Sequence, residues 1–429
     1  MTCTSRSGVP SIAIAAIVAC TTALPAQTIA ITGGRVFPVG GAPIDNGTVL
    51  IRDGRITAVG SNVTVPDGAE RIDATGKWVT PGLINAATQL GLVEIGLVAD
   101  TRQTTARGDG DAIAAAFTVW DGLNPNTVLI EPTRNEGITS VVVLPQGGLI
   151  SGQAALIDLV DGSAADMLVQ APVAMVGQVG APAQANMTAR GELIVRLREL
   201  LEDTRAYMRR KGEFERAATR PFVASRLDLE AMIPVVQGRL PLMVQANMAS
   251  DIEAALRLAR ENELRIIIAG GAEAWMLADR IAAARVPVMT GALDNLPSSF
   301  ATLGARQENA AILRQAGVEV IIVTGGGPES FNVRNVKQEA GNAVAYGMSW
   351  DDALRAVTLA PATALGVSDR LGTLAPGRVA NVVVWSGDPF ELSTRAEHVF
   401  VRGRRLTTRS RQDMLTDRYK TLPPRYSTP

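Results

Sequence analysis

Histidine and cysteine, the side chains that most often bind transition metals, are nearly absent from this sequence. The 429 residues include one histidine, His398, and two cysteines, Cys3 and Cys20. A zinc site takes three or four nitrogen, sulfur or carboxylate ligands, so these residues alone cannot build one. We therefore expect no cofactor, and no zinc chemistry of the histidine or cysteine type.

Carboxylates could hold a different kind of metal ion. Glu94, Glu273 and Asp294 each follow a short apolar run with the character of a β-strand. If these strands belong to one barrel, the three side chains face the same mouth. Three carboxylates with amides suit Mg²⁺ or Ca²⁺, which prefer oxygen ligands. Helix caps and loop charges use the same residue types, so a divalent cation is the alternative and not the first expectation.

A run of three glycines offers a third kind of site. Gly325, Gly326 and Gly327 follow Thr324, at the end of an apolar run. Backbone amides after the last strands of a barrel often bind phosphate. A relaxed turn explains the same glycines, so binding of an anionic metabolite is an alternative.

In the middle of the chain, apolar strands alternate with amphipathic helices. This α/β pattern predicts a (β/α)8 barrel of the TIM type over residues 79–366. The expected strands are 79–86, 138–144, 154–159, 173–179, 242–246, 264–269, 286–290 and 318–324. The longest expected helix is 191–216, with an apolar stripe of Leu193, Leu197, Leu200, Leu201 and Met208.

Both ends of the chain beyond the barrel are rich in β-strand signals. Asp53-Gly54 lies between alternating apolar residues, as in a hairpin turn, and a similar β-rich pattern returns near the C-terminus. We predict a small composite β-sandwich domain from residues 27–78 and 367–411, followed by a tail, 412–429, that contains one short helix. The arginines at 402, 404, 405, 409 and 411 are expected to form a solvated strand edge.

The first 26 residues are typical of a secretory signal peptide. Arg6 precedes an apolar run, 11–20, that is too short to span a bilayer, and small residues precede Ala26. We expect cleavage after Ala26 and export to the periplasm or the medium. Lipid attachment at Cys20 is the alternative. No later segment is expected to span a membrane.

The overall composition excludes other classes. The chain is 47% hydrophobic and carries 41 Lys and Arg against 42 Asp and Glu, a net charge of −1. Such a mixture supports a large core, and no basic excess indicates nucleic-acid binding.

Two long stretches resemble one known family. VLIRDGRITAVG followed by IDATGKWVTPGLINAATQLG is similar to the start of the barrel in the imidazolonepropionase-like branch of the amidohydrolase superfamily. AVAYGMSWDDALRAVTLAPATALGVSDRLGTLAPGRVANVVVWSGDP resembles the last helices of that branch and the return to its β-domain. The resemblance covers roughly residues 28 to 411. It implies hydrolysis of C–N bonds other than peptide bonds, with one or two metal ions at the barrel mouth activating a water.

The sequence departs from the metal ligands that the resemblance implies. Ala87 and Gln89 stand where a histidine pair is expected, and Gln245 and Asn247 where the fifth strand should supply a histidine. Gly325 replaces the aspartate expected after the last strand. Gln178 is the nearest counterpart of a bridging ligand. Alanine and glycine side chains cannot ligate, and neutral amides are poor ligands.

We therefore expect a superfamily member without its metal site, a pseudoenzyme that serves as a ligand-binding protein or partner subunit. An active hydrolase of cyclic amides or N-acyl compounds, using oxygen ligands or no metal, is the alternative. The expected partners are a small-molecule ligand and, in an oligomer, a second copy or an active amidohydrolase paralogue. The candidate pocket residues are Gln89, Glu94, Gln178, Gln245, Asn247, Glu273, Asp294, Thr324 and Gly325.

Overall fold

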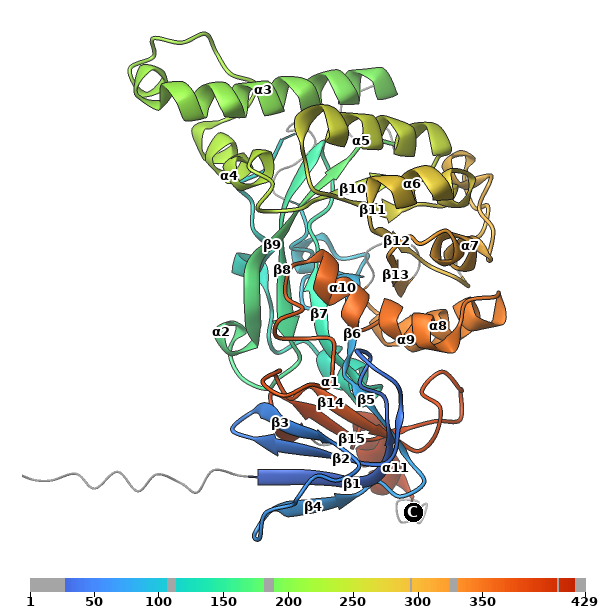
Figure 1. Cartoon of the computed structure of the whole chain (residues 1–429). Helices are drawn as coiled ribbons and strands as arrows, with labels where there is room; N and C mark the ends of the chain where they lie inside the picture. Colours follow the sequence, from blue (N-terminus) through green and yellow to red (C-terminus); the bar gives the residue numbers. More distant parts are fainter. Residues whose placement is uncertain are drawn as a thin grey trace, which may run out of the picture.

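The structure, a computed structural model, describes residues 28–105, 113–180, 189–293, 295–324, 330–406 and 409–420. It contains two eight-stranded sheets, one forming a barrel and the other combining strands from both ends of the chain. Figure 1 shows the second sheet below the barrel, with its blue N-terminal strands beside its red C-terminal ones. The expected α/β architecture, a TIM-type barrel plus a composite β-domain, is confirmed.

The barrel sheet is nearly closed. Its strands are hydrogen-bonded in the order β13-β12-β11-β10-β9-β8-β7-β6. Between the outermost strands, the Asn85 amide nitrogen donates to Thr324 Oγ1 (3.0 Å) and to the Val333 carbonyl (3.1 Å), so a side chain links the two edges. The strands are β6 (Leu83–Thr88), β7 (Ile138–Val143), β8 (Ile150–Asp158), β9 (Leu168–Gln178), β10 (Leu242–Ala246), β11 (Ile266–Gly270), β12 (Val288–Thr290) and β13 (Val320–Ile322).

One barrel strand runs against the others. β8 is antiparallel to both β7 and β9, whereas the remaining neighbours in the barrel are parallel. The regular alternation of a (β/α)8 barrel is therefore interrupted here. Only a short turn with positive φ at Gly147 and Gly148 separates β7 from β8. Such a turn can join antiparallel strands, but a parallel pair needs a longer crossover connection.

Helices cover the outside of the barrel. The longest described helix confirms the one predicted at residues 191–216. α3 (Arg190–Glu215) buries Leu193, Leu197, Leu200 and Leu201. Met208 is exposed, contrary to the expected stripe, and Tyr207 is buried beside α4, where its hydroxyl donates to Glu230 (2.8 Å). The other helices are α1 (Ile130–Asn135), α2 (Ala164–Met167), α4 (Arg226–Val236), α5 (Ala249–Asn262), α6 (Ala278–Ala284), α7 (Asn309–Gln315), α8 (Val336–Ala345), α9 (Trp350–Ala356), α10 (Leu359–Ala364) and α11 (Arg411–Tyr419). The last is the expected short helix of the tail.

The second sheet joins the two ends of the chain, because β14 pairs with β5. The first half of β1 pairs with β4, and the last residues of β1 pair with β5. The strands therefore form one continuous sheet, and they share one apolar core. The strands are β1 (Thr28–Val36), β2 (Ile44–Arg52), β3 (Arg55–Gly60), β4 (Glu70–Asp73), β5 (Trp78–Pro81), β14 (Val382–Trp385), β15 (Ala396–Val401) and β16 (Arg404–Leu406).

The first expected barrel strand, 79–86, is in fact two strands. β5 belongs to the second sheet and β6 to the barrel, and Gly82 lies between them. Pro81 has no N–H for a ladder, which favours a break there. A Cβ at Gly82 would lie 2.1 Å from Thr139 Oγ1, so only glycine fits where the chain crosses from one sheet to the other.

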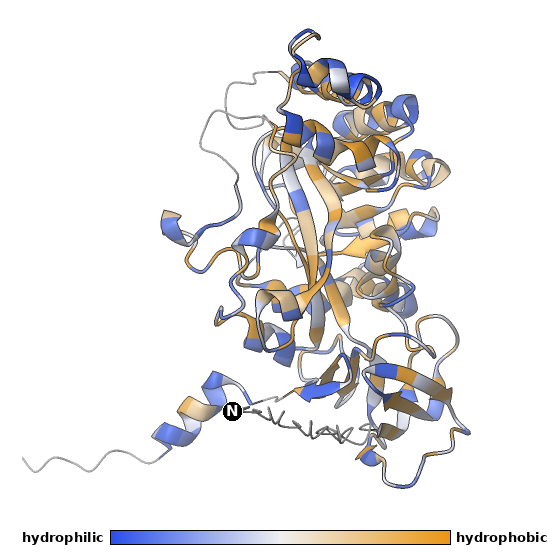
Figure 2. Ribbon diagram, turned by 90° about the vertical axis from the view of Figure 1, so that its left-hand side faces the viewer, coloured by the Kyte–Doolittle hydropathy of each residue, from blue (hydrophilic) through white to orange (hydrophobic). Residues whose placement is uncertain are grey.

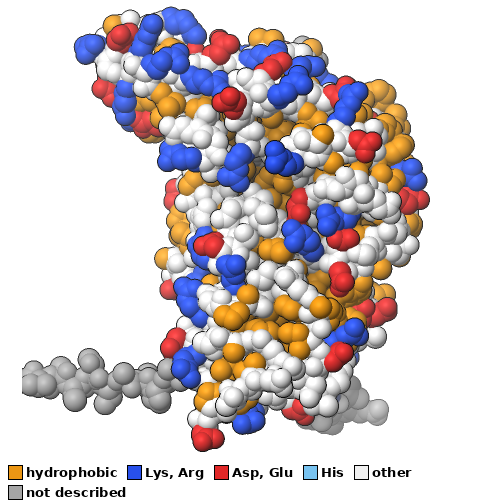
Figure 3. Space-filling view, viewed as in Figure 1, with side chains coloured by type: hydrophobic (Ala, Val, Ile, Leu, Met, Phe, Trp, Pro, Cys, Tyr) orange, Lys and Arg blue, Asp and Glu red, His pale blue; other side chains and the backbone are white. Residues whose placement is uncertain are grey.

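The apolar residues form three clusters. One fills the barrel, one lies mainly between barrel and helices, and one fills the second sheet. In Figure 2 the barrel strands are largely apolar, whereas the outer helices carry hydrophilic faces. On the face in Figure 3, basic side chains gather over α3 and α5, and apolar ones over the junction of barrel and second sheet.

Arg402 departs from the solvated edge expected of the C-terminal arginines. Its guanidinium reaches the barrel, where it donates to Asp158 Oδ2 (2.6 Å) and to the carbonyls of Asp166, Met167 and Leu168. Arg404 and Arg405 on β16 are exposed, as expected. One arginine of the cluster therefore joins the two parts of the molecule.

No helix within the described ranges is long and apolar enough to cross a membrane. The expected signal peptide, residues 1–26, lies outside the described residues, as does the end of the tail after residue 420.

Candidate functional site

A cavity of about 140 Å³ opens among the carboxyl ends of the parallel barrel strands. Apolar side chains form most of its wall, and the amides of three glutamines and one serine hydroxyl supply its polar side chains. None of the described side chains that line it is ionisable. The lining residues are Ala87, Leu144, Pro145, Gln146, Gly147, Ser151, Val176, Gln178, Met243, Gln245, Ala269, Gly270, Met289 and Val323.

Two of the glutamines stand side by side. Gln178 ends β9, and its register partner on the parallel strand β10 is Gln245. Neighbouring strands lie about 4.8 Å apart, and register partners in a parallel pair project to the same side. Both side chains are partly buried. The two amides can therefore contact one small ligand together.

Gln89 and Gln146 form a second pair of amides. The Gln89 amide nitrogen donates to Gln146 Oε1 (2.6 Å), and Gln89 is only 8% exposed. Gln146 lines the cavity, whereas Gln89 lies behind it and holds it in place. Gln146 was not among the expected pocket residues, although its position just after an expected strand, 138–144, could have indicated it.

Ser151 is a pocket residue that no sequence pattern indicated. It lies near the start of β8, and the start of a parallel strand would point away from the mouth. Because β8 is antiparallel, Ile150 instead pairs with Gly177 near the carboxyl end of β9. The reversal of β8 therefore brings the Ser151 hydroxyl to the cavity.

The two described carboxylates of the expected oxygen-ligand site are bound elsewhere. Glu94 accepts from Asn124 Nδ2 (2.9 Å) and Thr127 Oγ1 (2.8 Å), one bond to each carboxylate oxygen. Glu273 accepts from the backbone nitrogens of Ala249 (2.8 Å) and Gly304 (3.1 Å). Neither lines the cavity. The structure does not bring these two together as a ligand pair at the cavity, and Asp294 lies outside the described residues.

The other expected pocket residues lie around the cavity. Ala87, expected only as a lost ligand position, lines the cavity near the end of β6. Asn247 packs against the backbone at Gly270, where a Cβ would be 2.3 Å from its Oδ1. Thr324 is buried and accepts the bond from Asn85 that links the barrel edges. Gly325 and the rest of the glycine run lie outside the described residues.

A buried carboxylate that the sequence did not single out lies beside the site. Asp251, in the first turn of α5, is 3% exposed, and Arg190 Nε approaches one of its oxygens at 3.3 Å. Burial raises the pKa of Asp251 above its usual value; nearby Glu273 adds to the rise and Arg190 opposes it. A Cβ at Gly180 would lie 2.6 Å from Asp251 Oδ2. Asp251 thus packs against the chain that leaves β9, outside the cavity wall.

His398 lies in the second sheet, on β15, and lines no part of the barrel cavity. Burial lowers its pKa, and the nearby cations Arg405 and Lys77 add to this effect. Among the described residues, no group of three or more histidine, cysteine or acidic side chains is arranged to hold a metal ion.

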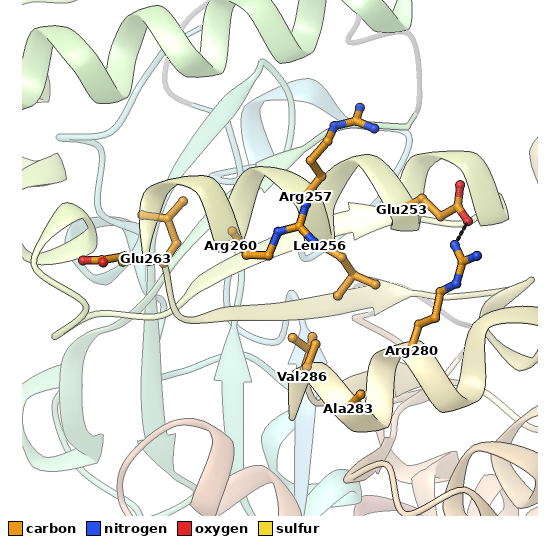
Figure 4. Close-up of a pocket in the computed structure, with 11 residues that line it drawn as sticks. Glu253, Leu256, Arg257, Arg260, Glu263, Arg280, Ala283 and Val286 are labelled. Atoms are coloured by element: carbon orange, nitrogen blue, oxygen red, sulfur yellow. Dashed lines mark hydrogen bonds and ion pairs between the residues drawn. The ribbon is translucent and has the colours of Figure 1, made fainter.

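A larger groove of about 700 Å³ lies on the outside of the barrel, between α5 and α6 (Figure 4). Arg257, Arg260, Arg280, Glu253 and Glu263 are on its walls, and Arg280 pairs with Glu253 across it. These are charges of both signs on solvated helix faces. The barrel mouth, where side chains from many strands converge, is the better candidate for a functional site.

Comparison with known proteins agrees with this fold. The amidohydrolase family matches residues 242–407. An amidohydrolase from Thermotoga maritima has a similar structure, with a TM-score of 0.80 and 27% identity over 89% of this chain and 100% of that one. The fold and the matches together define a class: this chain belongs to the amidohydrolase superfamily.

Relatives within the superfamily are distant. The amidohydrolase tasK of Hapsidospora irregularis is 25% identical over 396 residues, which cover 83% of this chain. This chain spans only 39% of the length of tasK. The imidazolonepropionase of Acidiphilium cryptum is 23% identical over 367 residues, covering 81% of this chain and 89% of that enzyme. By family and fold the chain groups with hydrolases.

Proposed function

We propose that this chain is a non-catalytic member of the superfamily whose barrel mouth binds a small uncharged ligand. The observation that carries the proposal is the wall of the cavity, where amides and apolar groups surround a space without an ionisable side chain among the described residues. A charged ligand would lose its hydration there without gaining a counter-charge. An uncharged ligand with hydrogen-bonding groups meets no such penalty.

The size of the cavity limits the ligand further. An apolar cavity of about 150 Å³ in another protein holds one benzene molecule, so a space of this order suits a single small ring. Each glutamine amide can donate and accept at once. We propose that Gln178 and Gln245 bind an edge that carries both a donor and an acceptor, such as an uncharged amide or urea.

The described side chains that line this cavity do not fit a catalytic metal ion. Ala87 offers no donor atom, and Gln178 and Gln245 offer only neutral amides, which bind transition metals weakly beside imidazole or carboxylate. An amide also cannot take a proton from water near neutral pH. This donor set supports loss of the metal-dependent reaction.

Elemental analysis of the full protein, purified without chelator, tests the missing metal site. We expect zinc, manganese and iron at well below one ion per chain. A stoichiometric transition metal that survives dialysis would overturn the proposal and favour an active hydrolase.

Ligand binding tests the amide site itself. In calorimetry against small cyclic amides and ureas, we expect Gln245→Leu to weaken binding about tenfold, the effect of about one lost hydrogen bond. Gln237→Leu, at the exposed end of α4, is the matched control and should bind as the wild type does. Equal binding by the wild type and Gln245→Leu would place the ligand elsewhere. Mass spectrometry of the same mixtures detects any hydrolysis.

The alternatives have less support. In the hydrolase with oxygen ligands, Glu94 and Glu273 would have to give up hydrogen bonds to both of their carboxylate oxygens. In the binding protein for an anionic metabolite, the described cavity wall offers no cation. Neither has a specific observation in its favour.

We also propose that the protein is exported, on the evidence of the signal-like sequence of residues 1–26. N-terminal sequencing of protein from the cell envelope fraction tests this. Export with cleavage after Ala26 gives an N-terminus at Gln27, whereas a lipoprotein begins at a modified Cys20. An intact N-terminus in the cytoplasm would contradict export.

A further inference from the structure

Exposed apolar side chains gather on loops at the carboxyl ends of the barrel strands, and we propose that two copies of this chain associate through them. The set, called the apolar rim below, is Ile95, Leu97, Met276, Leu296, Phe300 and Leu303. They are 47–98% exposed, and Leu97 (98%) and Phe300 (72%) project furthest. Exposed apolar side chains that gather in one region are typical of an interaction surface.

The rim residues come from neighbouring loops. They follow β6, β11 and β12, and the barrel order places these strands close together around the seam between β13 and β6. A Cβ at Gly304 would lie 2.8 Å from Met276 Cε, so the loops after β11 and β12 touch. A Cβ at Gly96 would lie 3.9 Å from Phe331 Cε2, which brings the loop after β6 against the loop after β13. The rim residues therefore follow the order of these loops around the barrel mouth, with the loops after β11 and β12 in contact and the loop after β6 against the loop after β13.

The loop with Phe300 and Leu303 is held with its apolar side chains outward. Asn295 Nδ2 donates to the Arg306 carbonyl (2.7 Å), and Trp275 Nε1 donates to the Gly304 carbonyl (2.8 Å). Between these anchors, Ser299 caps a 3-10 turn over Phe300–Thr302. Residues three apart in such a turn share a face, so Phe300 and Leu303 project together. The interface side chains are in place before a partner binds.

The lack of charged side chains on the loop with Phe300 and Leu303 favours a second copy of the chain as the partner over a lipid surface. Residues 295–304 contain no charged side chain. Loops that insert into a membrane surface usually add lysine or arginine; the nearby Arg306 pairs with Glu308 and lies over the Trp275 ring. In a two-fold dimer the same patch meets itself, and the uncharged loop 295–304, which carries Leu296, Phe300 and Leu303, adds no like-charge repulsion there.

The exposed area is enough for a modest interface. At about 60–120 Å² for each fully buried apolar side chain, six side chains at their observed exposures offer roughly 350 Å² per copy. Polar groups supply the rest of the area that an interface buries. With them, two copies would bury roughly 1,100 Å² in total, near the lower end of specific interfaces. We therefore expect a reversible dimer that lies across the cavity mouth.

Sedimentation equilibrium of the full chain tests this interface. We expect the wild type to form dimers as its concentration rises from about 1 to 100 μM. Phe300→Asp with Leu303→Asp should weaken dimerisation at least about 100-fold, because each change acts twice in a symmetric dimer. Leu392→Asp is the matched control: it places a charge on an exposed leucine in the loop between β14 and β15, and should dimerise as the wild type does.

Both variants alter exposed side chains, so unchanged circular dichroism and melting temperature confirm that they fold. A wild type that stays monomeric over this range would overturn the proposal. So would a Phe300→Asp, Leu303→Asp variant that dimerises as the wild type does.

Discussion

At the scale of single residues, the polar groups of the barrel mouth are neutral and come in pairs. Gln178 pairs with Gln245 through strand register, and Gln89 supports Gln146 through a hydrogen bond. The carboxylates beside the mouth, Glu94 and Glu273, are used to hold loops. The charge of these amides does not change near neutral pH, so ligand binding through them should be nearly independent of pH.

Glu230 shows how a surface carboxylate contributes to pH-dependent stability. Hydrogen bonds from Lys211 and Tyr207 lower the pKa of Glu230 from 4.5 to about 2. Because the folded pKa is the lower one, the stabilisation is complete above the unfolded pKa and is lost as the pH falls toward the folded one. We expect Glu230→Gln to destabilise the protein at neutral pH, with the difference shrinking below about pH 5.

Urea midpoints of wild type and Glu230→Gln at several pH values measure this. Glu202→Gln, an exposed position on the same helix as Lys211, should show no such trend. A penalty for Glu230→Gln that stays constant down to about pH 3 would contradict this linkage.

At the scale of elements, the turn between β15 and β16 attaches the second sheet to the barrel through Arg402. Asp158, the partner of its guanidinium, is 1% exposed and also accepts from Ser140 Oγ (2.7 Å) and Asn381 Nδ2 (3.0 Å). Removing Arg402 would leave a buried carboxylate without its cation. We expect Arg402→Ala to lower the free energy of unfolding by about 3 kcal/mol, measured by urea denaturation.

Arg404→Ala provides the control, because Arg404 is exposed on the adjoining strand β16. Its effect should stay within about 0.5 kcal/mol. If both substitutions lower the free energy of unfolding by the same amount, the contact between Arg402 and the barrel does not stabilise the protein.

At the scale of the whole molecule, barrel and second sheet share a core. Trp385 of β14 is fully buried in the main cluster, and its Nε1 donates to Thr80 Oγ1 (2.8 Å). Lys337 of α8 lies over its ring (5.8 Å) while pairing with Glu136 (2.5 Å). With such an interface the two parts should unfold in one transition, seen together by tryptophan fluorescence and circular dichroism.

Gly137 tests this interface. Its φ is +82° and a Cβ there would lie 2.1 Å from Trp385 Cη2, whereas Gly76, with φ +74°, has nothing within 4 Å. Gly76→Ala should cost about 1 kcal/mol for the backbone alone, and Gly137→Ala about 3 kcal/mol because the ring must also move. Thermal unfolding of both variants measures the difference. If both variants lose the same free energy of unfolding, the Trp385 ring can move away from the added methyl group without loss of stability.

Hydrophobic periodicity and turn residues along the chain were enough to predict the fold class, most strand positions and the helix α3. The resemblance to the amidohydrolases had indicated Gln178 and Gln245, and Ala87 as a lost ligand position; all three line the cavity. The tail helix followed from local signals as well. Local patterns suffice wherever neighbours in sequence set the environment.

The direction of β8 followed from pairing across the fold, and this pairing also placed Ser151 in the cavity. The tertiary structure also divided the first expected strand at Gly82 and assigned Arg402 to the barrel instead of a solvated edge. Glu94 and Glu273 were bound to loop groups distant in sequence. These outcomes depend on which strands pair and which side chains meet across the fold, and such contacts between distant residues leave no periodic signal in one sequence.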